Sequence, residues 1–311
     1  MSRIVVTGGA GRLGRSLVTG LAGFGHEIVS LDRIAAPELE QDGITQVALD
    51  LSDADAAASV LAGAKADALI HLAAIAVPFS APEDVIMRTN AGLAISVLHG
   101  AVRAGVPKIV AASSPTVLGY GCPTGWSPDR LPLDEDTPTR PWNAYALSKL
   151  LIEDTLGMLQ RQTGDATRFA AFRPCYVIAP EEWAGAPTQQ GHTVRERLDD
   201  PALSAPALFN YVDARDVAGF ADTLLAGMTE IPNGEVFFVG ASDALAREPL
   251  ADLLPQFHPG TAGAAAELTG TRPAFSIAKA ERLLGWRPQH DWRTELGERV
   301  PVAETVASAR S

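Results

Sequence analysis

The chain has 311 residues, a length that fits one α/β domain with a small appended lobe and can bury a large core. Its formal net charge of −12 argues against nucleic acid or an anionic membrane surface as the main partner, because both are bound through basic patches. The two cysteines, Cys122 and Cys175, offer neither metal-ligand spacing nor a disulfide framework, and they fit a reducing cytoplasm.

The first predicted element is a strand that leads through a glycine-rich turn into a helix. The apolar residues 4–6 precede Thr7-Gly8-Gly9-Ala10-Gly11-Arg12-Leu13-Gly14, after which apolar residues recur at helical spacing. Gly8 permits the tight turn, Gly11 lets the backbone approach a pyrophosphate, and Gly14 allows close packing of helix on strand. Because a helix N-terminus attracts phosphate, this segment is predicted to bind a dinucleotide through Gly8, Gly11, Arg12, Leu13 and Gly14.

The second predicted strand, residues 28–31, ends in Asp32. An acid at this position accepts hydrogen bonds from the adenosine ribose hydroxyls and would repel a 2′-phosphate. Arg33 and Arg12 could instead attract that phosphate. NAD is therefore favoured over NADP, with NADP kept as the alternative.

The later apolar runs alternate with helical patterns. Strands are expected at residues 45–49, 68–72, 108–112, 169–173 and 235–239, with helices at 54–61, at 83–104 and from about residue 143. This alternation predicts a doubly wound α/β fold, a parallel Rossmann sheet covered on both faces. Residues 1–176 and 210–240 are expected to form the NAD-binding domain. Residues 177–209 and 241–311, which are looser and contain one short helix near 193–198, are expected to form a small substrate-binding lobe.

Two residues at the start of the third of these helices could transfer protons. Tyr145 and Lys149 stand four residues apart, so the ammonium group would lie beside the phenol on one helical face. A free tyrosine has a pKa of about 10, and a neighbouring cation favours the phenolate. A long loop at residues 118–142, rich in proline and glycine, is expected beside this pair.

In this order along the chain, these residues resemble the extended short-chain dehydrogenase/reductase superfamily, specifically its NAD-dependent epimerase/dehydratase branch. The resemblance covers most of the chain and includes Asp50-Leu51, His71-Leu72-Ala73-Ala74, Asn90, Ser113-Ser114, Tyr145 with Lys149, Arg173-Pro174, residues 211–218, and Lys279 with residues 284–288. It implies that the cofactor also contacts Asp50, Leu51, Leu72, Ala73, Ala74, Asn90, Tyr145, Lys149 and Pro174.

The resemblance further implies a catalytic triad of Ser114, Tyr145 and Lys149. Tyr145 would exchange the proton of a carbinol, Ser114 would hydrogen-bond the same oxygen, and Lys149 would hold the ribose and lower the pKa of Tyr145. Hydride would pass between a substrate carbon and the nicotinamide, a step that needs no metal. The implied substrate contacts are Ala76, Ser114, Pro115, Thr116, Tyr176 and Arg215.

Several positions depart from parts of this family. Pro115 and Thr116 stand where sugar 4,6-dehydratases carry an Asp-Glu pair, which disfavours water elimination. Tyr176 replaces an asparagine that is usual in nucleotide-sugar epimerases, and only residues 174–210 separate Arg173 from Tyr211, fewer than such epimerases commonly use. The segment 113–120 looks similar to that of uronate dehydrogenases, although Ala76 replaces a serine and Leu118 replaces a frequent tyrosine.

These features predict an NAD-dependent oxidoreductase acting on a secondary alcohol of a sugar or sugar acid. The alternatives are a nucleotide-sugar 4-epimerase that retains its NAD and a non-catalytic NAD-sensing regulator. Three arginines of the lobe, Arg195, Arg197 and Arg215, could clamp phosphates and favour the epimerase. A small sugar-type molecule is the expected partner, and the resemblance is compatible with a homodimer. A cytoplasmic location without membrane segments is expected, because residues 68–79, the longest weakly polar stretch, are shorter than the roughly 20 residues that span a bilayer.

Overall fold

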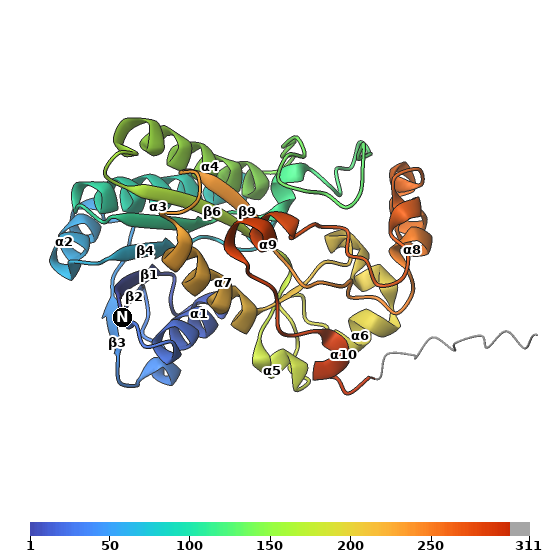
Figure 1. The fold of residues 1–311 in the computed structure, drawn as a ribbon, viewed down its shortest axis with the longest axis horizontal. Coiled ribbons are helices and arrows are strands. Elements are labelled where there is room, and N and C mark those ends of the chain that lie inside the picture. The colour runs from blue at the N-terminus through green and yellow to red at the C-terminus, as the bar shows by residue number, and fades with distance from the viewer. Residues whose placement is uncertain (299–311) are drawn as a thin grey trace, which may run out of the picture.

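A parallel β-sheet forms the centre of the computed structural model, which describes residues 1–298 (Figure 1). The strands of this sheet are β1 (Arg3–Thr7), β2 (Glu27–Asp32), β3 (Ile44–Ala48), β4 (Ala68–His71), β5 (Lys108–Ala112), β6 (Arg168–Pro174) and β9 (Glu235–Val239). Their order is β3-β2-β1-β4-β5-β6-β9, and every neighbouring pair is parallel. The predicted doubly wound Rossmann fold is confirmed.

Two layers of helices cover the faces of the sheet. One layer contains α1 (Arg12–Gly23) and α7 (Ala214–Gly227), and the other contains α2 (Ala54–Ala64), α3 (Glu83–Arg103) and α4 (Ala144–Thr163). Side chains alternate along each strand, so Ile4 and Val6 of β1 enter the hydrophobic cluster under α1 and α7, while Val5 enters the cluster under α2, α3 and α4. Burial on both faces explains why the central strands, such as β1 and β5, are apolar along most of their length.

Helix α3 is the one helix among residues 1–298 that is long and apolar enough to cross a membrane by length and composition alone. It packs between α2 and α4 against the sheet, and its buried side chains include Ile86, Val97 and Leu98. The apolar face of α3 is thus explained by the core. Residues 68–79, the stretch singled out from the sequence, form β4 and the loop that follows it.

The remaining elements gather to one side of the sheet, except α9, which packs against β9 and α7 (Figure 1). They are β7 (Val177–Ile178), α5 (Pro180–Trp183), α6 (Val194–Asp199), β8 (Val212–Asp213), α8 (Leu250–Phe257), α9 (Ala278–Leu284) and α10 (Trp292–Glu295). Residues 177–209 and 241–298 together are called the lobe. A third hydrophobic cluster joins these two segments, and its members are Ile178, Trp183, Val194, Leu198, Tyr211, Ala241, Leu245, Trp292 and Leu296.

The loop at residues 118–142 is pinned to the lobe. Leu133 pairs with Phe275 in an isolated bridge, and the Leu133 N–H donates to Ala274 O at 2.7 Å. The Tyr120 ring meets the ring of Phe275 edge to face, with centroids 5.7 Å apart. Ser127 adds a hydrogen bond from its hydroxyl to Gly260 O. These contacts hold the loop next to the first turn of α4.

Candidate active site

The glycine-rich turn between β1 and α1 is packed too closely for larger residues. Gly8 has a φ of +75°, and a Cβ placed on it would lie 2.8 Å from Ala73 N. A Cβ on Gly14 would lie 2.1 Å from Gly8 O. The N-cap of α1 is Gly11, which has no side chain to hydrogen-bond the N–H groups of the first turn. These N–H groups can therefore donate to a pyrophosphate. This cradle fits a dinucleotide.

Asp32 lies at the carboxyl end of β2, beside this turn. Its carboxylate accepts hydrogen bonds from the backbone N–H of Ala10 at 3.1 Å and of Arg33 at 2.7 Å. A carboxylate has about four acceptor positions, so it can support the turn and still accept from a ribose diol.

The side chain of Arg12 is held by the lobe. Its guanidinium forms an ion pair with Glu182 on α5, to which Nε donates at 2.6 Å, and it also donates to Val177 O. Glu182 is buried, so the pair joins the glycine-rich turn to the lobe. The contact of Arg12 with a cofactor, and its attraction for a 2′-phosphate, stay predictions.

The other predicted cofactor residues follow the carboxyl ends of the neighbouring strands. Asp50 is exposed after β3, where hydrogen bonds from Ser52 lower the pKa of its carboxyl, and Leu51 beside it is buried. Leu72, Ala73 and Ala74 are half-buried directly after β4, and Pro174 ends β6. The fold thus brings these segments to the edge that holds the glycine-rich turn.

Asn90 instead has a structural role in the described structure. Its Oδ1 accepts from Ile75 N at 2.7 Å, and its Nδ2 donates to Ile75 O at 3.2 Å and to Ser148 Oγ at 3.0 Å. Asn90 is fully buried on α3. These hydrogen bonds hold the segment after β4 against α4, and a contact of Asn90 with the cofactor stays a prediction.

Ser114, Tyr145 and Lys149 come together at the carboxyl end of β5. Ser114 lies near the end of this strand, while Tyr145 and Lys149 lie on the first turns of α4. Asn143 caps this helix, and its side chain accepts from Ala146 N. Lys149 Nζ lies 5.9 Å from the centroid of the Tyr145 ring and donates to Ala112 O at 2.9 Å. All three side chains of the predicted triad are buried.

The pKa of Tyr145 is raised, whereas the sequence led us to expect that it would be lowered. Burial raises the pKa of the Tyr145 phenol above its ordinary value, and the hydroxyl of Ser114 partly opposes this shift. Burial also lowers the pKa of Lys149 to about 8. Lys149 was expected to lower the pKa of Tyr145, but its ammonium group is directed at the carbonyl of Ala112, so burial dominates.

His71, at the end of β4, lies near Lys149. Its Nδ1 is 2.7 Å from the hydroxyl of Thr7, and its Nε2 is buried without a hydrogen-bond partner among residues 1–298. Burial lowers the pKa of His71 to about 3, and the nearby Lys149 adds to the shift. His71 is thus neutral and links the end of β1 to the surroundings of Lys149.

The predicted substrate residues are only partly brought together. Pro115 and Thr116 open a short 3-10 turn in which the Thr116 hydroxyl donates to Ser114 Oγ at 2.9 Å. Ala76 is exposed in the loop after β4. Arg215 pairs with Asp213 at 2.6 Å and Glu295 at 2.8 Å. Two carboxylates of the protein therefore hold its guanidinium, and its assignment as a substrate ligand stays a prediction.

Tyr176 lies just beyond β6 between two arginines. The guanidinium carbons of Arg12 and Arg197 are 5.9 Å and 4.3 Å from the centroid of its ring. From the sequence, Arg197 is only one of three lobe arginines that could clamp phosphates, and Glu182 has no expected role. Contacts between residues so far apart in the chain leave no local sequence pattern that would predict them. The capping box of Thr193 and Glu196 indicates the helix that carries Arg197, but it does not indicate where the Arg197 side chain points.

Comparisons with known proteins agree with this arrangement. A model of the NAD dependent epimerase/dehydratase family matches residues 4–240. A UDP-glucose 4-epimerase of Azospirillum brasilense is 32% identical over 50% of this chain, and the match covers only 43% of that enzyme. A uronate dehydrogenase of Agrobacterium fabrum is 31% identical over 67% of this chain and 74% of that enzyme.

A solved structure supports the same relationship across the lobe. The crystal structure of a UDP-galactose 4-epimerase superposes with a TM-score of 0.66 and 26% sequence identity, covering 95% of this chain and 96% of that one. The sheet, the glycine-rich turn and the family match over residues 4–240 show that this chain belongs to the NAD-dependent epimerase/dehydratase family of extended short-chain dehydrogenases/reductases.

Proposed function

We propose that this protein is an NAD-dependent dehydrogenase that oxidises a secondary alcohol of a sugar or sugar acid. The observation that carries the proposal is the meeting of Ser114, Tyr145 and Lys149 beside the glycine-rich turn, all buried and on two adjoining elements. A buried phenol next to a hydroxyl is suited to exchanging the proton of an alcohol. Bound NAD would accept the hydride of that alcohol.

The residues of the chain divide the remaining tasks. Gly8, Gly11 and Gly14 make the phosphate cradle, and Asp32 is proposed to accept from the ribose diol, which favours NAD over NADP. Lys149 would bind the second ribose, and Ser114 would hydrogen-bond the reacting oxygen. We also propose that residues 1–176 and 210–240 form the cofactor domain and that the lobe binds the substrate.

The substrate class rests on the departures from nucleotide-sugar enzymes. Tyr176 replaces an asparagine usual in such epimerases, and two carboxylates, Asp213 and Glu295, hold Arg215. Arg195 is exposed and donates to Leu296 O at 3.0 Å, so Arg197 alone of these three arginines is buried without an acidic partner among residues 1–298. The match to a uronate dehydrogenase favours a free sugar acid. The matches to UDP-glucose 4-epimerases keep a nucleotide-sugar 4-epimerase with retained NAD as the competing function.

The proton-transfer assignment is tested with Tyr145→Phe. This variant should lower turnover by roughly 10²- to 10⁴-fold, the usual effect of removing a positioned acid or base, while NAD affinity stays nearly unchanged. Lys149→Ala should lower both turnover and NAD affinity. Lys108→Ala is the matched control, because Lys108 also donates to a backbone carbonyl, Leu225 O at 2.7 Å, but at the opposite end of β5. Near-full activity of Tyr145→Phe would contradict the assignment.

The competing functions are separated by the fate of the cofactor. A dehydrogenase mixed with NAD and a sugar acid should release NADH, which is followed by its absorbance. A 4-epimerase should instead retain NAD through gel filtration and interconvert a UDP-sugar without net NADH. Thermal-shift measurements with NAD, comparing free sugar acids with UDP-, GDP- and dTDP-sugars, provide a second readout. Stabilisation by a nucleotide sugar alone would reject the dehydrogenase.

A further inference from the structure

Arg197, on α6, is a buried cation that lacks an acidic partner among residues 1–298. Its side chain is 1% exposed, its guanidinium stacks over the ring of Tyr176, and its Nη1 donates to Gln190 Oε1 at 2.6 Å. Its Nε has no hydrogen-bond partner in this part of the chain, and neither does the buried hydroxyl of Tyr176. Two neighbouring side chains thus leave polar groups unpaired, although buried donors are normally satisfied.

The nearby acids are engaged by other arginines. Both carboxylate oxygens of Glu182 accept from Arg12, and one of them also accepts from Ala179 N. Asp199, two residues from Arg197 on α6, pairs with Arg247 at 2.9 Å. Two arginines therefore share the surroundings of one carboxylate, which leaves about one positive charge without compensation.

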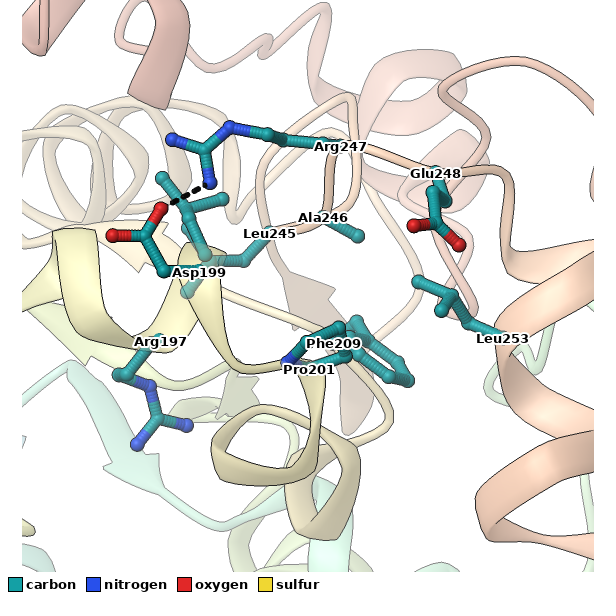
Figure 2. Close-up of a pocket in the computed structure, with 10 residues that line it drawn as sticks. Arg197, Asp199, Pro201, Phe209, Leu245, Ala246, Arg247, Glu248 and Leu253 are labelled. Atoms are coloured by element: carbon teal, nitrogen blue, oxygen red, sulfur yellow. Dashed lines mark hydrogen bonds and ion pairs between the residues drawn. The ribbon is translucent and has the colours of Figure 1, made fainter.

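Arg197 also lines a pocket of about 280 Å³ in the lobe. Figure 2 shows the guanidinium of Arg197 pointing away from the ion pair of Arg247 and Asp199. Burial lowers the pKa of the Arg197 guanidinium, and Arg12 contributes to the shift. An unpaired buried charge costs free energy, so a ligand that supplies the missing negative charge would relieve this cost.

The position of the pair relates it to the proposed reaction site. Tyr176 follows the end of β6, and its N–H donates to Asn210 Oδ1 at 2.7 Å. The side chain of Asn210 also hydrogen-bonds Tyr120. The pKa of Tyr120 is raised by burial first, then by Cys175 and then by Tyr145, so the phenols of Tyr120 and Tyr145 lie near each other. A chain of neighbouring side chains thus runs from Arg197 through Tyr176, Asn210 and Tyr120 to Tyr145.

We infer that Arg197 and the hydroxyl of Tyr176 bind the carboxylate of an anionic sugar substrate. This inference rests on the proposed function and adds that the substrate is a sugar acid. A carboxylate accepts several hydrogen bonds from a guanidinium and a hydroxyl, and its single charge matches the uncompensated cation. A pyrophosphate oxygen of the cofactor has the same acceptor chemistry, so the experiment measures substrate and cofactor separately.

The test compares Tyr176→Phe, Arg197→Met and the control Arg195→Met, which changes an exposed arginine on the same helix. Binding of D-galacturonate, of the neutral sugar D-galactose and of NAD is measured for each protein by calorimetry. Arg197→Met should weaken D-galacturonate binding by about 10- to 100-fold, the usual effect of losing a hydrogen bond to a charged group. NAD and D-galactose binding should stay as in the parent protein, and so should all binding by Arg195→Met.

Tyr176→Phe guards against a folding defect in Arg197→Met. The tyrosine hydroxyl has no partner in the described structure, so its removal should leave the melting temperature without ligand unchanged. Its removal should still weaken D-galacturonate binding by about 5- to 10-fold. Parent-like D-galacturonate binding by this variant would overturn the inference. So would a loss of NAD affinity in Arg197→Met, which would assign the site to the cofactor, or equal binding of the acid and the neutral sugar by the parent.

These results are distinguishable from failure of the proposed function. D-galacturonate that binds through Arg197 but yields no NADH would reject the dehydrogenase and retain the carboxylate site. A neutral sugar that is oxidised equally by the parent and by Arg197→Met, with no preference for its acid, would retain the dehydrogenase and reject the carboxylate site.

Discussion

Replacing His71 by asparagine should make the free energy of unfolding less sensitive to acid. Folding lowers the pKa of this imidazole from 6.5 to about 3, with burial as the first cause and Lys149 as the second. Below pH 6.5 the unfolded chain takes up a proton at His71 that the folded chain does not. The stabilising contribution is therefore fully present above pH 6.5 and is lost as the pH falls toward 3.

The magnitude at pH 5 follows from the distance between that pH and the unfolded pKa of 6.5. At 1.36 kcal/mol per pKa unit, His71 costs the folded state about 2 kcal/mol at pH 5 relative to pH 8. Asparagine does not titrate and its amide can replace Nδ1 in the bond to Thr7. When the pH falls from 8 to 5, the free energy of unfolding of His71→Asn should thus decrease by about 2 kcal/mol less than that of the parent protein.

Urea denaturation of both proteins at several pH values between 5 and 9 measures this difference. Above pH 7 the two stability curves should run parallel, which provides an internal control. Lys149→Met should retain most of the acid sensitivity, because burial is the larger cause of the shift. If the curves of the parent and of His71→Asn stay parallel down to pH 5, His71 is not a neutral buried imidazole. If Lys149→Met loses the acid sensitivity of the parent, repulsion from Lys149 outweighs burial as the cause of the shift in the pKa of His71.

Three further predictions concern the cofactor and the proton transfer. NAD should bind at least tenfold more tightly than NADP, a difference of about 1.4 kcal/mol, because Asp32 would repel a 2′-phosphate; equal affinities in fluorescence titrations would contradict this role. Gly14→Ala should greatly weaken NAD binding because its Cβ would lie 2.1 Å from Gly8 O, whereas Gly23→Ala on the same helix, with no atom within 4 Å, should bind NAD like the parent. Alcohol oxidation should accelerate from pH 7 to 10, because burial raises the pKa of Tyr145 and rising pH supplies the phenolate; a rate that falls over this range would contradict Tyr145 as the base.

The strands of the main sheet could be predicted because most are apolar runs between helical patterns; β3, with Thr45 and Gln46 in its sequence, is the least apolar of them. The small sheet could not, since β7 and β8 contain two residues each and show no periodicity. The glycine-rich turn and the Tyr145–Lys149 spacing are local, so the sequence places them correctly on their elements. The side-chain directions of Arg12 and Arg215 depend on acids supplied by other elements, so the sequence could not predict these ion pairs.

The third hydrophobic cluster has a consequence for the order in which the chain folds. Tyr211 donates to Asp243 and accepts from the backbone N–H of Trp292, a contact 81 positions apart in sequence. The last sheet strand, β9, ends at Val239, so about 50 more residues must leave the ribosome before Trp292 arrives, which takes roughly 3 to 10 seconds at ordinary translation rates. During this interval apolar residues such as Ile178 lack part of their covering. The nascent chain should therefore need chaperone protection late in synthesis, after its sheet is complete, and the packed lobe should be the last part of the fold that it completes.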